Sequence, residues 1–173
     1  CGQTAVFHVF AQLAGPSAGG ITGAEYKIAI GPNGSADAGW LFSEAFASGI
    51  TTVGTGALTP VDPSVRGVTL AWPSCQMGCT GLVLIETVTV FNSCSFDILR
   101  LEVVKHDSPS NQFFQCPVLV LCDAPTYTKV CVGNPFTGQN PEPPFPFNAM
   151  CSTGGRAYLN DRGTMPATCS QGT

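Results

Sequence analysis

Residues 96–104 read Phe-Asp-Ile-Leu-Arg-Leu-Glu-Val-Val, and this stretch gives the clearest indication of the fold class. Leu99, Leu101 and Val103 fall on one side of an extended chain. Arg100 and Glu102 fall on the other side. A two-residue period of this kind is typical of a β-strand that buries one face. The sequence therefore predicts a strand here.

Strand-like patterns recur on both sides of this stretch, separated by turns rich in Gly and Pro. We expect further strands at residues 5–11, 25–30, 51–56, 66–72, 80–91, 118–122, 128–132 and 156–160, and strand or irregular structure at 40–50. The sequence Asp123-Ala-Pro-Thr126 predicts a hairpin between 118–122 and 128–132. Residues 5–11 are apolar on both faces, which favours a central strand.

Many short strands with almost no helix predict an all-β, antiparallel β-sandwich of the Ig-like type. The 173 residues fit one domain, so we expect a single domain over 1–173. Residues 133–150 hold five prolines and cannot form a core strand, because proline lacks the donor that a strand ladder needs. We expect a Pro-rich surface excursion there.

Cysteine usage predicts a disulfide framework. The two histidines and the absence of paired Cys-x-x-Cys motifs argue against zinc, so an oxidising compartment is expected. Spacing leaves the connectivity open. A Cys75–Cys79 bridge would contribute roughly 2 kcal/mol, and a long-range bridge such as Cys1–Cys169, which would also tie down both ends, on the order of 5 kcal/mol. The disulfide candidates are Cys1, Cys75, Cys79, Cys94, Cys116, Cys122, Cys131, Cys151 and Cys169.

The charge content excludes some functions and raises a question about the surface. Charged residues make up 10% of the chain, whereas about 25% is typical. Either a neutral polar exterior or burial in an assembly accounts for this. A net charge of −4 with scattered Lys and Arg argues against nucleic acid as a partner. No apolar run reaches the roughly 18 residues of a membrane span.

The first residue is consistent with a chain from which a signal peptide has been cleaved. The chain starts at Cys1 without an initiator Met, which is typical of a secreted protein whose signal peptide has been removed. A lipid-modified Cys1 is the alternative. We therefore expect an extracellular or cell-surface location.

Several segments together carry a family resemblance. They are Gly19-Gly-Ile-Thr-Gly-Ala-Glu-Tyr-Lys-Ile28, Gly39-Trp40, Cys94-Ser-Phe-Asp-Ile-Leu99, Cys116-Pro-Val-Leu-Val-Leu-Cys-Asp123 and Gly154-Gly-Arg-Ala-Tyr-Leu-Asn160. The chain resembles a family of small, secreted bacterial β-sandwich domains that bear cysteines, are distantly cohesin-like and have no assigned activity. The resemblance implies fold and location but no catalytic residues, and the insert 135–147 departs from it.

Catalytic motifs are not found, so we expect no enzyme activity. His8 and His106 lack a nucleophile context, and no Gly-x-Ser-x-Gly elbow or phosphate loop exists. The carboxyls of Glu86, Asp97 and Glu102 show no spacing that marks a glycosidase pair.

We expect no cofactor. Calcium is the open alternative, through the loop residues Asp107, Asp123 and Asp161, although no Asp-x-Asp-x-Asp run is present. Asn33-Gly-Ser35 is a glycosylation sequon and equally a plain turn.

The sequence favours a structural subunit of a fibre, sheath or surface layer that assembles with copies of itself. Low charge and an odd number of cysteines motivate this prediction, with Cys1 as the candidate for an intermolecular bond. The alternative is an adhesion module that binds carbohydrate or protein. Its binding surface would comprise Trp40, Pro141, Pro143, Pro144, Phe145 and Phe147, while Tyr26, Trp72, Tyr127 and Tyr158 are further aromatic candidates. Packing in the core is the competing interpretation for each Trp and Tyr.

Overall fold

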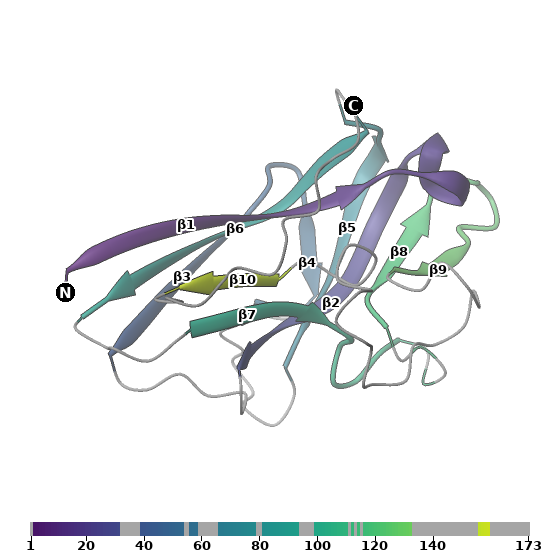
Figure 1. Ribbon diagram of the computed structural model, residues 1–173. Helices are drawn as coiled ribbons and strands as arrows, with labels where there is room; N and C mark the ends of the chain where they lie inside the picture. The colour runs from purple at the N-terminus through teal and green to yellow at the C-terminus, as the bar shows by residue number, and fades with distance from the viewer. Residues whose placement is uncertain are drawn as a thin grey trace.

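The computed structural model describes residues 2–31, 39–53, 56–58, 66–78, 81–93, 99–110, 112, 114, 116–132 and 156–159 (Figure 1). Within these residues the chain forms ten β-strands and one short 3-10 helix. Every strand pairing is antiparallel. The predicted all-β, antiparallel class is therefore confirmed.

The bounds of the ten described strands are as follows. They are β1 (Gln3–Gln12), β2 (Ile21–Gly31), β3 (Trp40–Phe46), β4 (Thr51–Val53), β5 (Val68–Gln76), β6 (Leu82–Asn92), β7 (Leu99–Val104), β8 (Val118–Leu121), β9 (Lys129–Cys131) and β10 (Arg156–Leu159). The 3-10 helix η1 (Gly15–Gly19) joins β1 to β2. No described helix is long and apolar enough to cross a membrane.

Each segment expected to be a strand contains one. The uncertain stretch 40–50 begins as β3, and the predicted hairpin is confirmed, since β8 pairs with β9 with Val118 opposite Cys131. Alternation predicted the buried face of β7 correctly, because Leu99 and Leu101 are both buried. The Pro-rich segment 133–150 lies outside the described residues.

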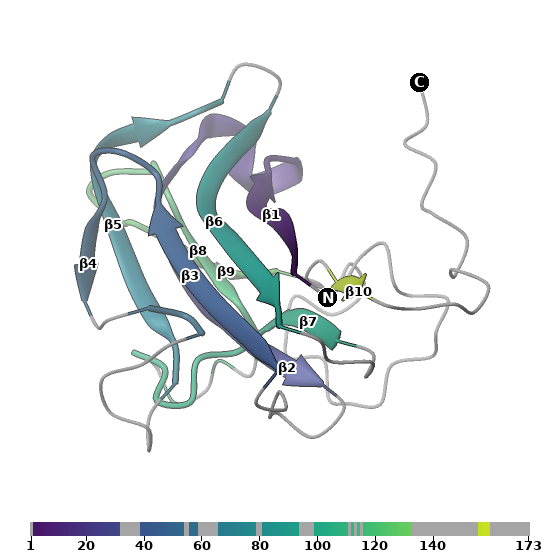
Figure 2. The same cartoon turned by 90° about the vertical axis from the view of Figure 1, so that its left-hand side faces the viewer.

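A three-stranded sheet has the order β1-β6-β3. Figure 2 shows β3 and β6 running side by side along this sheet. The prediction that residues 5–11 form a central strand is wrong, because β1 lies at the edge of this sheet. The prediction failed because residues 5–11 carry apolar side chains on both faces of β1, but one of these faces is exposed among the described residues.

A second sheet of seven described strands is built around β2. Its main order is β10-β7-β2-β5-β4, and β8 pairs with β2 and β9. Residues Ile21 to Glu25 pair with both β5 and β8, so this part of β2 is enclosed on both edges. The register shifts between Ile21 and Gly23 in both pairings. Against β8 the extra residue is Thr22, whereas against β5 the extra residues, 72–75, belong to β5. The Thr22 hydroxyl donates a hydrogen bond to the Trp72 carbonyl at 3.0 Å.

The bulge requires glycine at position 23. A Cβ atom on Gly23 would lie 2.8 Å from the Leu70 carbonyl oxygen and 3.2 Å from Val120 Cγ2. These atoms belong to the two strands that flank β2, so neither neighbour can move away without opening the sheet. Gly23 therefore allows β5 and β8 to approach β2 closely at this point.

Buried side chains from the two sheets form one hydrophobic cluster. The three-stranded sheet contributes residues such as Trp40, Val88 and Val90, and β2 contributes Tyr26 and Ile28. Burial of apolar surface is the main stabilising contribution to such a fold. The shared cluster holds the two sheets against each other.

Candidate functional site

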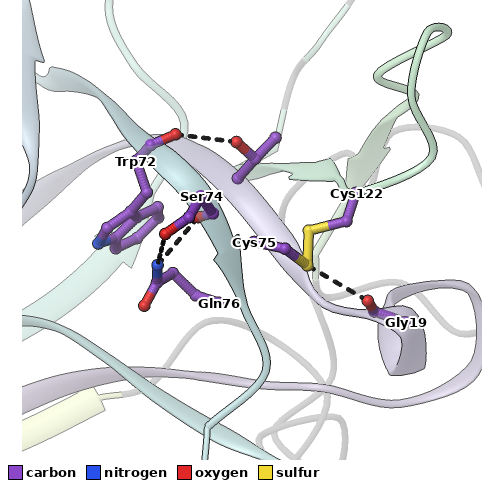
Figure 3. Close-up of a disulfide and its surroundings, with 7 residues drawn as sticks. Gly19, Trp72, Ser74, Cys75, Gln76 and Cys122 are labelled. Carbon is purple, nitrogen blue, oxygen red and sulfur yellow. Dashed lines mark hydrogen bonds between the residues drawn. A yellow bond between two sulfur atoms is a disulfide. The ribbon is translucent and has the colours of Figure 1, made fainter.

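Two disulfide bonds lie within the described residues. Cys75 at the end of β5 bonds to Cys122 just after β8, with their Cα atoms 5.7 Å apart (Figure 3). Cys116 bonds to Cys131, which joins the two strands of the β8–β9 hairpin. Of the bridges that the sequence leaves open, Cys75–Cys79 does not form. The partner of Cys75 is 47 residues away in sequence and becomes its neighbour only when β5 and β8 flank β2.

The disulfides indicate an oxidising, extracellular-type environment, since such bonds persist where thiols are not kept reduced. The remaining candidates, Cys1, Cys79, Cys94, Cys151 and Cys169, lie outside the described residues. Both described bonds hold β8, one to its hairpin partner β9 and one across β2 to β5. They therefore stabilise the part of the larger sheet around η1.

A polar cluster lies inside the core between the two sheets. The hydroxyl of Tyr26 on β2 donates a 2.5 Å hydrogen bond to Oε2 of Glu86 on β6. Glu86 has no exposed surface, and its Oε1 has no hydrogen-bond partner among the described residues. Glu44 on β3 also contacts Glu86, and its Oε1 accepts a 2.6 Å hydrogen bond from the Leu58 backbone N–H.

This environment favours the neutral form of Glu86. Burial raises the pKa of Glu86 to about 8, and the hydrogen bond and negative charge of Glu44 also raise it, while the hydrogen bond from Tyr26 lowers it. Burial and the nearby Glu86 carboxyl raise the pKa of Tyr26 above its ordinary value. Because Glu86 is closed off from solvent, its protonation state bears on the stability of the fold.

A second set of polar contacts fastens the loop after β7 to β2. Glu25 is buried on the face of β2 opposite Tyr26, and its carboxylate accepts hydrogen bonds from the Ser110 backbone N–H at 3.0 and 3.1 Å. Lys27 forms an ion pair with Asp107, which also accepts a hydrogen bond from the Arg66 backbone N–H. Burial acts to raise the pKa of Asp107, but these hydrogen bonds outweigh it and hold that pKa below its ordinary value.

The two described loop carboxylates considered as calcium ligands, Asp107 and Asp123, accept hydrogen bonds from other residues of the protein. Asp107 holds Lys27 and Arg66, as described above. Asp123 accepts hydrogen bonds from the backbone N–H and the hydroxyl of Thr128, which lower the pKa of Asp123. Asp161 lies outside the described residues. The described part of the chain contains no group of three or more His, Cys, Asp or Glu residues that could hold a metal ion.

The aromatic residues do not form a described sugar-binding platform. Trp40, 6% exposed, belongs to the core, as do Tyr26 and Trp72. Trp40 therefore does not present its ring to a ligand, which removes it from the predicted binding surface. Tyr127 is exposed in the β8–β9 turn. The remaining residues of that surface, Pro141, Pro143, Pro144, Phe145 and Phe147, lie outside the described residues, as does the sequon at Asn33.

The two histidines lie in different settings. His106 is buried, and its Nδ1 lies 3.0 Å from the Ser108 backbone N–H, which donates to it. His8 is exposed on β1, where its Nδ1 lies 3.1 Å from the Thr87 hydroxyl. The His8 ring also lies beside Phe10, with the ring centres 6.0 Å apart. Neither of these hydrogen bonds belongs to a described triad of nucleophile, histidine and carboxylate.

The exposed face of the three-stranded sheet is the most unusual surface of the described residues. Strand alternation and the register place thirteen side chains on this side, and none carries a carboxylate, ammonium or guanidinium group. We call this surface the outer face. It comprises Thr4, Val6, His8, Phe10, Gln12, Leu41, Ser43, Ala45, Leu82, Leu84, Thr87, Thr89 and Phe91.

Large apolar side chains are concentrated on the outer face. Most of the exposed large hydrophobic residues in the described chain belong to it, namely Val6, Phe10, Leu41, Leu82, Leu84 and Phe91. Val53, Met77 and Tyr127 are the others. Singly scattered apolar residues are ordinary on a protein surface, whereas a contiguous apolar patch marks an interaction site. The outer face is therefore the candidate functional surface.

Comparisons of the chain with models of protein families, with curated proteins and with solved structures found no match.

Sequence reasoning missed both the buried cluster and the outer face, although signals for each were present. Glu86 interrupts the apolar run 80–91. If this strand is buried, the carboxyl of Glu86 needs a hydrogen-bond partner. Residues 5–11 are apolar on both faces, which marks a strand that needs cover on both sides. The local pattern does not identify the residue that bonds to Glu86, nor the element that covers residues 5–11.

Proposed function

We propose that this protein is a non-catalytic extracellular structural protein, a subunit of a fibre, sheath or surface layer that assembles with copies of itself. The observation that carries the proposal is the outer face, which is uncharged, exposed and rich in large apolar side chains. Such a face is costly to leave in water, and burial against another molecule removes that cost.

The composition of the whole chain supports the same proposal. A soluble monomer ordinarily keeps its surface well charged and free of large apolar patches. Here only 18 Lys, Arg, Asp and Glu residues, 7 basic and 11 acidic, serve 173 residues. At least three of the acidic groups are committed to internal contacts, since Glu25, Glu86 and Asp107 hold strands or loops together.

The proposed scaffold is a β-sandwich of the Ig-like or cohesin-like type, as in the family that the sequence resembles. Two antiparallel sheets that contribute to one hydrophobic cluster support this. Secretion of the chain is part of the proposal and is supported by the disulfides. A rigid, cross-linked sandwich suits a load-bearing subunit.

Assembly in solution tests the proposal. Sedimentation velocity and negative-stain electron microscopy of the oxidised full-length chain should show oligomers or fibres whose population grows with protein concentration. Non-reducing gels would report whether an intermolecular disulfide accompanies assembly. A chain that stays monomeric at every concentration, with no interchain bridge, would falsify the proposal.

Binding to carbohydrate or to a surface protein has less support. Trp40, the one residue of the predicted binding surface that the structure describes, is buried in the core. Glycan binding that survives Trp40→Phe, which keeps the core aromatic, would point to a different site and would revive that function.

A further inference from the structure

We propose that β1 pairs, antiparallel, with β1 of a second copy of this chain, with His8 of each copy on the twofold axis. This inference rests on the proposed function, because it names the partner and the contact through which copies associate. Such a pairing would join the two three-stranded sheets into one continuous sheet and would extend the outer face across both copies.

The first observation is that no described strand pairs with the edge of β1 that lies away from β6. Among the described residues β1 pairs only with β6 along Gln3–Gln12, so its other edge offers free backbone N–H and C=O groups. Natural edge strands are usually protected by charged side chains, proline, bulges or short length. β1 is ten residues long and contains no proline and no Lys, Arg, Asp or Glu. Its pairing with β6 shifts in register between Val9 and Phe10, but the extra residue, Ile85, belongs to β6 and not to β1.

The second observation is that β1 has the sequence pattern of a central strand. Its side chains alternate between the outer face and the core side. The core-side set is largely apolar, whereas the outer-face set contains two large apolar side chains, Val6 and Phe10, and no Lys, Arg, Asp or Glu. A long, uncharged edge strand that exposes apolar side chains is a template for pairing with a strand of another chain. The mismatch between this pattern and the edge position indicates that a further strand completes the sheet.

The third observation identifies the second copy as the source of that strand. Opposite residues in an antiparallel pair share a face, so a twofold axis perpendicular to the sheet must pass between two copies of one residue. With the axis at His8, each residue faces a partner of its own kind. On the outer face Val6 lies opposite Phe10 and Thr4 opposite Gln12, and on the core side Ala5 lies opposite Ala11 and Phe7 opposite Val9.

Neighbouring registers match less well. With the axis at Phe7, Thr4 would lie opposite Phe10 and Gln3 opposite Ala11. With the axis at Val9, Gln12 would lie opposite Val6. Each of these registers places a polar side chain against an apolar one, and cross-strand pairs of this kind are less favourable than apolar pairs. The His8 register is therefore preferred.

The pairing is self-complementary and closed. A twofold interface of this kind uses the same patch on both copies and produces a dimer. Growth into a fibre then needs a second contact elsewhere on the molecule. The β1 pair is thus the building unit of the proposed assembly and not the whole of it.

The decisive experiment is disulfide trapping across the axis. Opposite Cα atoms of antiparallel strands lie about 4.5–5.5 Å apart, which a disulfide can span. His8→Cys in the oxidised full-length chain should therefore form a covalent dimer. The link is assigned by digestion and mass spectrometry of mixed isotope-labelled and unlabelled protein, so that position 8 of one copy is seen bonded to position 8 of the other.

The opposite edge of the same sheet supplies a matched control. Ala45 on β3 occupies the same row as His8, since both lie opposite Thr87 of β6, and both are exposed. Ala45→Cys should give no such link. A position-45 link with no position-8 link would place the contact at β3 and overturn the β1 pairing.

Charge variants give an independent readout in solution. His8→Lys places two like charges opposite each other at the axis and should raise the dimer dissociation constant about tenfold or more. His8→Gln keeps the position polar and neutral and should leave dimerisation largely intact, as should Ala45→Lys. Sedimentation equilibrium measures the constants, and thermal unfolding confirms that each variant is folded.

The outcomes separate the two proposals. A wild-type chain that never associates removes the proposed function and this inference together. A chain that associates, but shows neither the position-8 link nor any effect of His8→Lys, keeps the proposed function and overturns the β1 pairing. Association of β1 with an unrelated protein, without self-association, would overturn both.

Discussion

Tyr26 and Glu86 meet between the two sheets, where the Tyr26 hydroxyl donates a hydrogen bond of 2.5 Å to Glu86 Oε2. The two residues are 60 positions apart in the chain, on β2 and β6. A buried carboxyl with this partner and with Glu44 nearby links the stability of the fold to pH.

Stability should fall as the pH rises from about 4.5 to about 8, because of Glu86. Its pKa is raised from 4.5 to about 8 in the folded protein, so the folded chain keeps a proton that the unfolded chain releases in this range. The contribution is fully present below pH 4.5 and is lost as the pH passes through about 8, amounting to roughly 5 kcal/mol at most. Urea unfolding across pH 4–9 measures it.

Two variants check the assignment to Glu86. Glu86→Gln stays neutral at every pH and can still accept the hydrogen bond from Tyr26, so it should remove most of this slope. Glu44→Gln removes a neighbouring negative charge that raises the pKa of Glu86, so the loss should end at a lower pH. An unchanged slope in Glu86→Gln would contradict the assignment.

Tyr26→Phe should destabilise the protein more at high pH than at low pH. The ring remains packed in the core, but Glu86 loses its hydrogen-bond donor, at a cost of about 1–3 kcal/mol when the carboxyl is charged. Hydrogen bonds to charged groups are stronger than those between neutral groups, so the cost should be smaller at pH 5 than at pH 9. Tyr127→Phe alters an exposed ring and serves as the control. Equal losses at both pH values would argue against this account.

Removal of the Cys75–Cys122 bond should lower stability by about 4 kcal/mol. The bond closes a loop with a sequence separation of 47, and in the chain-entropy model it restricts the unfolded state accordingly. The comparison is a double variant, Cys75→Ser with Cys122→Ser, studied by urea unfolding. The Cys116–Cys131 bond closes a separation of only 15, so its removal by Cys116→Ser with Cys131→Ser should cost about 3 kcal/mol. No loss in the first variant would show that its unfolded state gains little freedom.

Gly20→Ala should be strongly destabilising, while Gly19→Ala should not. Gly20 has φ of 102°, and a Cβ there would overlap Cys75 Sγ and lie 3.0 Å from the Gln76 carbonyl oxygen. The backbone strain alone costs about 1–3 kcal/mol, and the overlap adds to it. A Cβ on Gly19 would meet no atom within 4 Å. Thermal unfolding of the two variants compares adjacent positions, and equal effects would contradict the close packing against the disulfide.

The strand positions could be predicted from the sequence because alternation is a local property of the chain. The pattern of Leu99, Leu101 and Val103 records one buried face wherever the strand is placed. The same reasoning failed for β1, whose two apolar faces predicted a central position. The alternation shows which faces of a strand are apolar, but it carries no information on which neighbouring strand or molecule covers them.

The candidate site could be predicted only in fragments. Trp40 was a candidate for ligand binding or for the core, and its burial was decided by the packing of β3 against the second sheet. Glu44 and Glu86 carry no mutual spacing in sequence, and they meet because β3 and β6 are neighbours. The outer face likewise exists only once β1, β6 and β3 are brought together in register.

By itself the sequence determined the all-β class, the strand positions, the hairpin of β8 and β9 and the presence of disulfides, since each depends on residue type or on short-range periodicity. The tertiary structure decided which cysteines bond, which strands lie at an edge, and where Glu86 finds Tyr26. These depend on contacts between residues tens of positions apart, because such contacts form only when distant strands pair and bury their faces together.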